Sequence, residues 1–332
     1  MDGAIKVSVV LPTYCGERYI RQSIESILQN RYEEFELIVV DQSPTRAIEQ
    51  LIQEFFPSDP RLKYVHIEKC GASHARNVGT QLSSGELMLF GDDDVVVTPE
   101  WINAYVNCYT QLLSSGIKPG AMGGPVEGLW EAEKPPWWPE EYGYLICEFD
   151  MGNQRKEYEQ GWLPFSANIA FPKDILQEVG GFHEGMGPKA DSKLSVRVTG
   201  EDTLCVMKVR QKGYPLYYEP NAKVFHIMIK ERLSKKYYLK RIFEEGCTQV
   251  NVRFLLYPVT RRVMVTMAYD SLSRLVKCGK RFITGRFFSN SWNEKTQMLE
   301  LGLMGIAMGE LYWTWKCFVS RKISNLSTNT DI

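Results

Sequence analysis

This sequence of 332 residues lacks closely spaced cysteine pairs, long apolar runs and a strong net charge. Its eight cysteines are scattered and none belongs to a CxxC pair, which argues against a zinc or redox motif and excludes a dense disulfide framework. Reduced thiols are therefore expected, in a reducing compartment. The net charge of −1 argues against a nucleic acid as partner.

The apolar segments are too short to cross a membrane. The stretch that precedes Pro12 is shorter than the apolar core of a signal peptide. The most apolar later segment, residues 299–318, contains Glu300, Glu310 and Lys316, so it predicts a buried or interfacial helix and not a bilayer span. We expect a cytoplasmic protein.

Charge is unevenly distributed along the chain. Residues 230–290 contain 14 Lys and Arg against 4 Asp and Glu, which leaves an acidic remainder. Such a basic segment, with Tyr237, Tyr238, Phe243, Phe254 and Trp292 nearby, suits contact with anionic lipid on the inner face of a cell membrane. A solvated helical cap is the alternative.

Strand-like and helix-like segments alternate four times over about 90 residues, beginning at residue 6. Buried-strand patterns occur at 6–12, 36–41, 62–67 and 86–92, each followed by a helical pattern, the last of which begins at Thr98 and Pro99. This alternation predicts a mostly parallel sheet with helices on its faces. Residues 124–164, rich in Pro and Trp, predict a long irregular loop. Shorter elements and then a helical tail after His226 are expected to follow.

Three consecutive aspartates, Asp92, Asp93 and Asp94, follow the fourth predicted strand. Each negative charge raises the cost of ionising its neighbours, and a divalent cation removes that cost. Carboxylates from one short loop suit Mg²⁺ or Mn²⁺, which also accept phosphate oxygens. Because ligands of such sheets bind beyond the carboxyl ends of the strands, the triplet predicts a metal site there. Solvated turn charges are the alternative.

Other polar residues support either a functional or a structural interpretation. Asp41 ends a strand and could form an Asx-turn. Arg76, near a helix start, could hold a diphosphate or be a solvated surface residue. Asp202 fits a helix capping box, yet a carboxylate there also suits a general base. His226 could be structural or a metal ligand.

The ordered segments resemble family 2 glycosyltransferases of the GT-A fold. They are "VSVVLPTYCGERYIRQSIESIL", "ELIVVDQS", "GASHARNVG", "LMLFGDDDVVVTPEW", "IAFPKDILQEVGGFHE" and "GEDTLCVMKVRQKGY", and they cover about residues 5–228. The resemblance implies a Rossmann-like α/β fold, with a mixed, mostly parallel sheet flanked by helices and a C-terminal helical extension. It implies a catalytic domain at 1–228, with a nucleotide-sugar half at 1–123 and an acceptor half at 124–228, and a basic helical region at 229–332.

The resemblance also implies roles for individual residues. The metal, Mn²⁺ or Mg²⁺, would be held by Asp94, with Asp92 and His226 completing its shell. Within the Glu201–Asp202 pair, Asp202 matches the catalytic base. The nucleotide-sugar would be contacted by Pro12, Thr13, Tyr14, Glu17, Asp41, Gln42, Arg76, Asp92 and Asp93. Gln42 replaces an acid that usually contacts the base ring, and UDP is the default because an amide can still read uracil.

The implied activity is an inverting, metal-dependent transfer of a sugar from a nucleotide-diphospho-sugar to an acceptor hydroxyl. The acceptor would be a saccharide or lipid-linked saccharide, in bacterial polysaccharide or glycan biosynthesis; the Trp/Pro stretch and helical tail resemble bacterial members that build surface polysaccharides. Two alternatives stay open. A sugar-phosphate nucleotidyltransferase would carry a Gly/Arg/Lys-rich loop where this chain has "LPTYCGERY", and Asp94 and Asp202 argue against a non-catalytic nucleotide-sugar-binding assembly partner.

Overall fold

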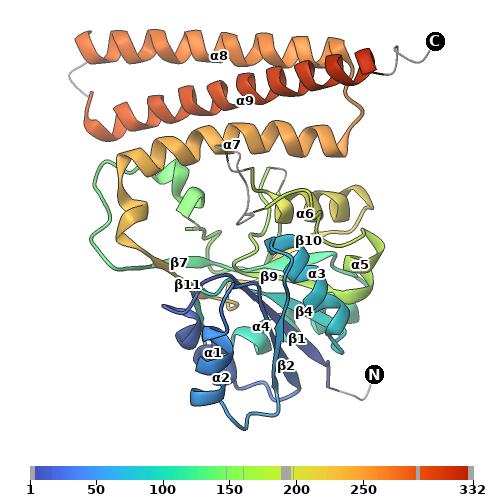
Figure 1. Cartoon of the computed structure of the whole chain (residues 1–332). Coiled ribbons are helices and arrows are strands. Elements are labelled where there is room, and N and C mark those ends of the chain that lie inside the picture. The colour runs from blue at the N-terminus through green and yellow to red at the C-terminus, as the bar shows by residue number, and fades with distance from the viewer. Residues whose placement is uncertain are drawn as a thin grey trace. The chain divides into compact units, whose positions relative to one another are not determined.

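The computed structural model describes residues 4–146, 148–159, 161–187, 196, 198–288 and 292–327. The chain forms two compact units, and Figure 1 labels most of their helices and strands. The first unit comprises Met1–Leu129, Cys147–Lys193 and Glu201–Met228. The second comprises Trp130–Ile146, Leu194–Gly200 and Ile229–Ile332.

The first unit is built on an eight-stranded sheet in the order β3-β2-β1-β4-β9-β6-β10-β8. The strands are β1 (Val7–Thr13), β2 (Phe35–Asp41), β3 (Leu62–His66), β4 (Leu87–Phe90), β6 (Ala121–Gly123), β8 (Lys156–Glu157), β9 (Ile169–Pro172) and β10 (Leu216–Tyr218). Strands β1 to β4 are mutually parallel, as are β6 and β10, whereas β9 runs antiparallel to β4 and β6. The predicted mixed, mostly parallel sheet is confirmed.

Helices cover both faces of this sheet because successive strand residues point to opposite sides. Val9 and Leu11 of β1 lie in one apolar core, with residues of α1 (Ile20–Leu28), α2 (Ala47–Phe55) and α4 (Trp101–Ser114). Val10 lies in the other core, with residues of α3 (Ala72–Leu82), α5 (Lys173–Glu178) and α6 (Glu201–Gln211). Strands β1, β2 and β4 are buried along their whole length, as their continuous apolar runs predict.

A second sheet of three strands, in the order β5-β11-β7, differs from what the sequence predicts. Strands β5 (Val95–Val97) and β7 (Val126–Trp130) form where no strand is expected. Strand β11 (Val224–Met228) pairs with β5 in antiparallel register, so that His226 lies opposite Val95. Helix α4 also begins later than predicted, at Trp101, because the Thr98 hydroxyl donates to the Lys223 carbonyl, at 3.2 Å, instead of capping the helix.

The second unit contains two 3₁₀ helices, η1 (Glu140–Ile146) and η2 (Lys230–Leu233), and three long helices. These are α7 (Lys235–Leu256), α8 (Arg261–Phe288) and α9 (Glu294–Ser327), of which α9 packs against both α7 and α8 (Figure 1). The α7–α9 crossing is close: a Cβ atom on Gly246 would come within 2.1 Å of the Ile306 carbonyl oxygen. Among the described residues, no helix has the length and apolar character that a membrane crossing requires.

Candidate functional site

The carboxyl ends of β1, β2 and β4 meet at one edge of the large sheet. Thr13 at the end of β1 is in register with Asp41 at the end of β2. Strand β4 ends at Phe90, which is in register with Val10, so the acidic triplet continues from there alongside the last residues of β1. The topology therefore brings the triplet to the loop after β1, as expected for ligand-binding edges of such sheets.

Asp93 fastens the triplet to that loop. Its carboxylate accepts a hydrogen bond from the Thr13 hydroxyl at 2.5 Å, and the Ser23 hydroxyl donates to its carbonyl oxygen at 2.9 Å. Burial, and then the charges of Asp94 and Asp92, raise the pKa of Asp93 to about 7. A Cβ atom on Gly16 would lie 2.1 Å from the same carboxylate, so the loop can approach this closely only with glycine there.

Asp94 and His226 are brought together by the pairing of β5 with β11. The backbone N–H of Ile227 donates to the Asp94 carbonyl at 2.8 Å, and the His226 Nε2 atom lies 3.3 Å from an Asp94 carboxylate oxygen. His226 is buried, and among the described residues its Nδ1 atom has no hydrogen-bond partner. A buried polar atom without a partner costs free energy, so a ligand or water bound to this nitrogen would stabilise the folded protein.

Within the described part of the chain, Asp92, Asp94 and His226 form a group that could hold a metal ion. Their ligand atoms all lie within 4.8 Å of one another. Carboxylate oxygens suit Mg²⁺ and Mn²⁺, and imidazole suits transition metals. The three residues therefore fit a divalent cation such as Mg²⁺ or Mn²⁺. The structure brings together the three metal ligands that the sequence predicted.

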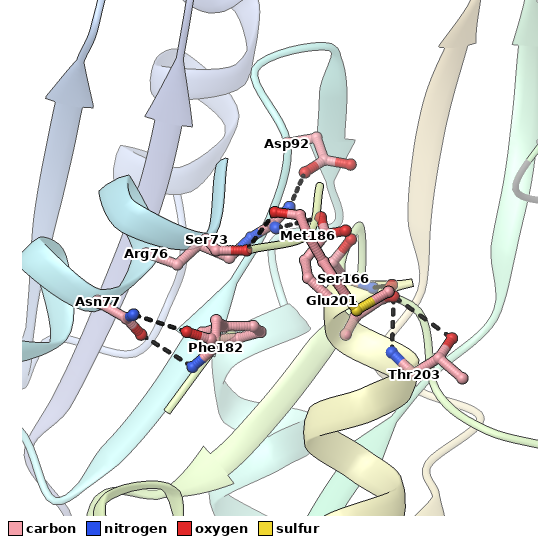
Figure 2. A network of polar contacts seen from close by, with 10 residues as sticks. Ser73, Arg76, Asn77, Asp92, Ser166, Phe182, Met186, Glu201 and Thr203 are labelled. Atoms are coloured by element: carbon pink, nitrogen blue, oxygen red, sulfur yellow. Dashed lines mark hydrogen bonds and ion pairs between the residues drawn. The ribbon is translucent and has the colours of Figure 1, made fainter. Parts of the chain in front are cut away.

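Arg76 links the acidic strand end to helix α6. It is 3% exposed; its Nη2 atom donates to Asp92 at 3.0 Å and its Nη1 atom donates to Glu201 at 2.9 Å (Figure 2). Within the part of the chain that the structure describes, its Nε atom has no hydrogen-bond partner. The guanidinium is therefore a buried bridge between two carboxylates, and the surface alternative for this residue does not hold.

Glu201 and Asp202, the first residues of α6, have different surroundings. Glu201 is buried against Arg76; burial raises its pKa, while the charge of Arg76 acts to lower it. Asp202 is half-buried, and its two carboxylate oxygens accept hydrogen bonds from the backbone N–H groups of Ser166, at 2.9 Å, and Thr203, at 2.7 Å. These bonds fix the orientation of Asp202 at the helix start.

Helix α3 is held in place by the loop that follows α5. The Asn77 amide exchanges two hydrogen bonds with the backbone of Phe182, at 2.8 and 2.9 Å, and the Ser73 hydroxyl donates to the Met186 carbonyl at 3.0 Å (Figure 2). The ring of Phe182 lies beside the Arg76 guanidinium, 5.5 Å from ring centre to guanidinium carbon. Sequence reasoning missed Asn77, Phe182 and Ser166, because contacts made through backbone groups leave no residue pattern.

Some of the residues predicted to contact the nucleotide already make hydrogen bonds within the protein. Asp41 is fully buried; one of its oxygens accepts from the Ser43 N–H and the other from the Tyr64 hydroxyl, each at 2.8 Å. The first of these contacts is the Asx-turn that the sequence left open. The Gln42 side-chain oxygen accepts a hydrogen bond from the Gly71 N–H at 2.5 Å.

The loop after β1 contains the remaining predicted nucleotide contacts. Pro12 is buried, whereas Tyr14 and Glu17 are exposed. Between them, Cys15 adopts a left-handed conformation with φ of 53°, and its N–H donates to the Ser43 hydroxyl at 2.8 Å. The turn thus presents Tyr14 and Glu17 to solvent beside the buried ends of β1 and β2.

Residues 8–144 match the family described as "Glycosyl transferase family 2". Over 285 residues the chain is 30% identical to a glucosyl-dolichyl phosphate glucuronosyltransferase of Haloferax volcanii, and the match covers 82% of this chain and 88% of that protein.

Two solved structures are similar in fold. The mannosyltransferase PcManGT from Pyrobaculum calidifontis, in complex with GDP-Man and Mn²⁺, superposes with a TM-score of 0.59 at 18% identity, over 94% of this chain and 88% of the other. GalNAc-T7 with UDP, GalNAc and Mn²⁺ gives a TM-score of 0.55 at 14% identity, over 89% of this chain and 54% of the other.

Proposed function

The chain belongs to glycosyl transferase family 2, and we propose that it moves a sugar from a nucleotide-diphospho-sugar to an acceptor hydroxyl, with a divalent cation and with inversion at the anomeric carbon. Family membership and the GT-A fold support glycosyl transfer, and the site's residues support the proposed donor, cation and stereochemistry. The observation that carries the inference is the cluster of Asp92, Asp94 and His226, joined through Arg76 to the start of α6.

Asp92, Asp94 and His226 would hold the cation, for which Mn²⁺ or Mg²⁺ is proposed. Two fold relatives are described with Mn²⁺, and a ligand set that includes imidazole favours Mn²⁺ over Mg²⁺. When bound, the cation would offset the negative charge that develops on the diphosphate as it leaves. Arg76 is proposed to act by fixing the Asp92 carboxylate, since both of its bonded nitrogens already face carboxylates.

Asp202 is proposed as the general base. Each of its carboxylate oxygens accepts one backbone hydrogen bond and keeps capacity for another, so the side chain is oriented yet able to accept the proton of an acceptor hydroxyl. Attack from the face opposite the diphosphate would invert the anomeric carbon in one step. Glu201, predicted alongside it as catalytic, is proposed to hold Arg76, because its buried carboxylate already faces that cation.

The nucleotide is proposed to lie against the loop after β1 and the ends of β1 and β2. Asp41 would support this surface without contacting the nucleotide, since both of its carboxylate oxygens already accept hydrogen bonds within the protein. The Gln42 side-chain oxygen already accepts a hydrogen bond from the Gly71 N–H. Its amide N–H₂ would therefore contact the nucleotide base, as a donor to a ring carbonyl such as one of uracil. UDP therefore remains the default donor nucleotide.

The acceptor is proposed to be a saccharide or a lipid-linked saccharide. The Haloferax volcanii relative is named for a reaction on a dolichyl phosphate-linked glucose, which favours the lipid-linked class. The predicted place in bacterial polysaccharide or glycan biosynthesis stays a prediction.

Three isosteric variants test the assignment: Asp94→Asn, Asp202→Asn and, as a control on α8, the exposed Asp270→Asn. Thermal shifts with UDP, GDP and their sugar conjugates in Mn²⁺ first identify the nucleotide, since a ligand of the native state raises its stability. We expect Asp94→Asn to lose Mn²⁺-dependent nucleotide binding at least about tenfold, through loss of a charged ligand. Asp202→Asn should bind the donor normally and release nucleoside diphosphate about 10²–10⁴-fold more slowly.

The control should behave as the wild type in both assays. Full turnover by Asp202→Asn would remove it as the base, and Mn²⁺-dependent binding retained by Asp94→Asn would remove the metal assignment. Once a product is available, its anomeric configuration by NMR decides the stereochemistry, and retention would refute the one-step displacement.

A further inference from the structure

Helix α8 is attached to its unit along one narrow line. Its buried side chains, Met264, Ser271 and Cys278, recur every seven residues and therefore lie on one side of the helix. Two ion pairs fasten the same helix to α9, from Arg274 to Glu310 and from Arg281 to Glu300. Figure 1 shows α9 between α8 and α7, so within the described part of this unit the side of α8 away from α9 faces no other helix.

An apolar stripe runs along α8 on the side away from that line. Its members are large and between 49% and 71% exposed: Val265, Tyr269, Leu272, Val276, Ile283 and Phe287. At about 100° per residue these six fall within about 60° of one another, and their centre lies about 130° round the helix from the buried line. Scattered exposed apolar residues are normal, but a continuous stripe of this length indicates a surface that is covered.

Cations flank the stripe on both sides. The helix carries seven Lys and Arg against a single acid, Asp270. Besides the two arginines paired to α9, the described part of the chain gives no ion pair to the other five cations, which are Arg261, Arg262, Lys277, Lys280 and Arg286. By the same geometry, four of them, all but Lys277, lie within about 70° of the stripe's centre, and Asp270 lies about 130° away.

We propose that this face of α8 lies in the plane of an anionic lipid bilayer, with the stripe at the boundary of headgroups and acyl chains. An amphipathic helix with an apolar strip between cations has the composition of interfacial helices. The flanking cations would meet lipid phosphates, each at a gain of about 1 kcal/mol near an anionic surface. The stripe spans 22 residue steps, or about 33 Å of helix, along the membrane surface.

Charge decides between lipid and a second copy of this chain. Two copies joined stripe to stripe would bring the cations beside each stripe close to those of the partner, and like charges across an interface are unfavourable. The expectation that Tyr238 touches lipid is corrected. Tyr238 is fully buried in a cluster with Trp137, Trp138 and Tyr142, so the stripe on α8 supplies the contact in its place.

Vesicle flotation of the full chain tests this surface without any sugar substrate. We expect binding to phosphatidylglycerol-containing vesicles and little binding to pure phosphatidylcholine. Lys280→Glu and Arg286→Glu should each weaken binding at least about fivefold. Val276→Ser should weaken it about threefold to tenfold, through the loss of apolar burial. Leu82→Ser in α3 is the matched control, because Leu82 and Val276 are both 49% exposed, and it should bind as the wild type does.

The proposal is overturned if the wild type does not bind anionic vesicles, if it binds neutral vesicles equally well, or if Leu82→Ser loses as much binding as Val276→Ser. Light scattering is run in parallel: a dimer that Val276→Ser converts to a monomer, without vesicle binding, would assign the stripe to a second copy. Mn²⁺-dependent nucleotide binding by the same variants should be unchanged, so failure of this proposal is separable from failure of the proposed chemistry.

Discussion

Replacing Arg76 by methionine would test the buried charges that join the acidic triplet to helix α6. The substitution removes the cation but keeps an unbranched, apolar side chain that fills part of the same space. Glu201 is 5% exposed, and among the described residues one of its carboxylate oxygens already has no partner, so its charge would then be buried without a cation. Removing one partner of a buried ion pair costs about 3–5 kcal/mol, so we expect a loss of that size at neutral pH.

The double variant separates this charge effect from simple loss of packing. Glu201→Gln alone keeps an oxygen that can accept from Arg76 and leaves the bond to Asp92, so about 1–2 kcal/mol should be lost. Arg76→Met with Glu201→Gln leaves no unpaired charge at position 201, and the Asp92 carboxylate that also loses Arg76 is 29% exposed. The double variant should therefore be more stable, by about 2 kcal/mol, than the sum of the single variants predicts. Urea midpoints followed by circular dichroism provide the comparison.

The pH dependence gives the sharper readout. Burial raises the pKa of Glu201, and without Arg76 its pKa rises further. An acid whose pKa is raised by folding stabilises the folded state below its unfolded pKa, and this stability is lost as pH rises through the folded pKa. Arg76→Met should therefore be less destabilised at about pH 5 than at about pH 8, and adding Glu201→Gln should abolish the difference. The reasoning would be refuted if the free-energy losses of the two single variants simply added up in the double variant, or if the loss caused by Arg76→Met did not change with pH.

Two further predictions concern Glu36 and Gln42. Although burial raises the pKa of Glu36, hydrogen bonds from Lys63, Ser8 and Ser84 lower it to about 2. The ionised carboxylate should contribute about 3 kcal/mol of stability, fully present above about pH 4.5 and lost as pH falls to about 2. In urea titrations, the difference in unfolding free energy between wild type and Glu36→Gln should therefore shrink to zero over that pH range. A difference that stays constant with pH would contradict the prediction. Gln42→Glu can keep the acceptor for the Gly71 N–H but loses the amide donor. Calorimetry should show that the variant binds nucleoside diphosphate about threefold to tenfold more weakly and binds pyrophosphate unchanged. Equal losses for both ligands would count against recognition of the nucleotide base by Gln42.

The alternation of strands and helices up to residue 114 could be predicted because each element carries its own local pattern. Ile20, Ile24 and Ile27 repeat at helical spacing, and the runs that form β1, β2 and β4 are continuously apolar, as buried parallel strands are. The prediction of an irregular stretch at 124–164 was wrong in part, because β7 lies within it. Burial alternates along this strand, but its sequence VEGLW does not alternate between apolar and polar residues. Strand β5 has only three residues, too few for a period to be recognised.

The site was predictable in composition but not in its connections. The triplet indicated a cation by charge alone, whereas His226 reaches Asp94 only through the pairing of β5 and β11, which are about 130 positions apart in the chain. The contact between Arg76 and Glu201 spans a similar separation. Long-range contacts of this kind depend on strand order and register, and no local pattern encodes them. For Asp41 the structural alternative, an Asx-turn, is present.

Asp92 takes part in both halves of the site, and this shared position explains why Arg76 is buried there. One Asp92 oxygen accepts from Arg76, and Asp92 also supplies a ligand atom to the cluster with Asp94 and His226. A carboxylate anchored on one side can rotate little, so it is oriented before any cation arrives. The other end of the same guanidinium anchors Glu201, the residue next to Asp202. A single buried arginine therefore sets the position of a proposed metal ligand and of the helix start that carries the proposed base, and a change at Arg76 should disturb both together.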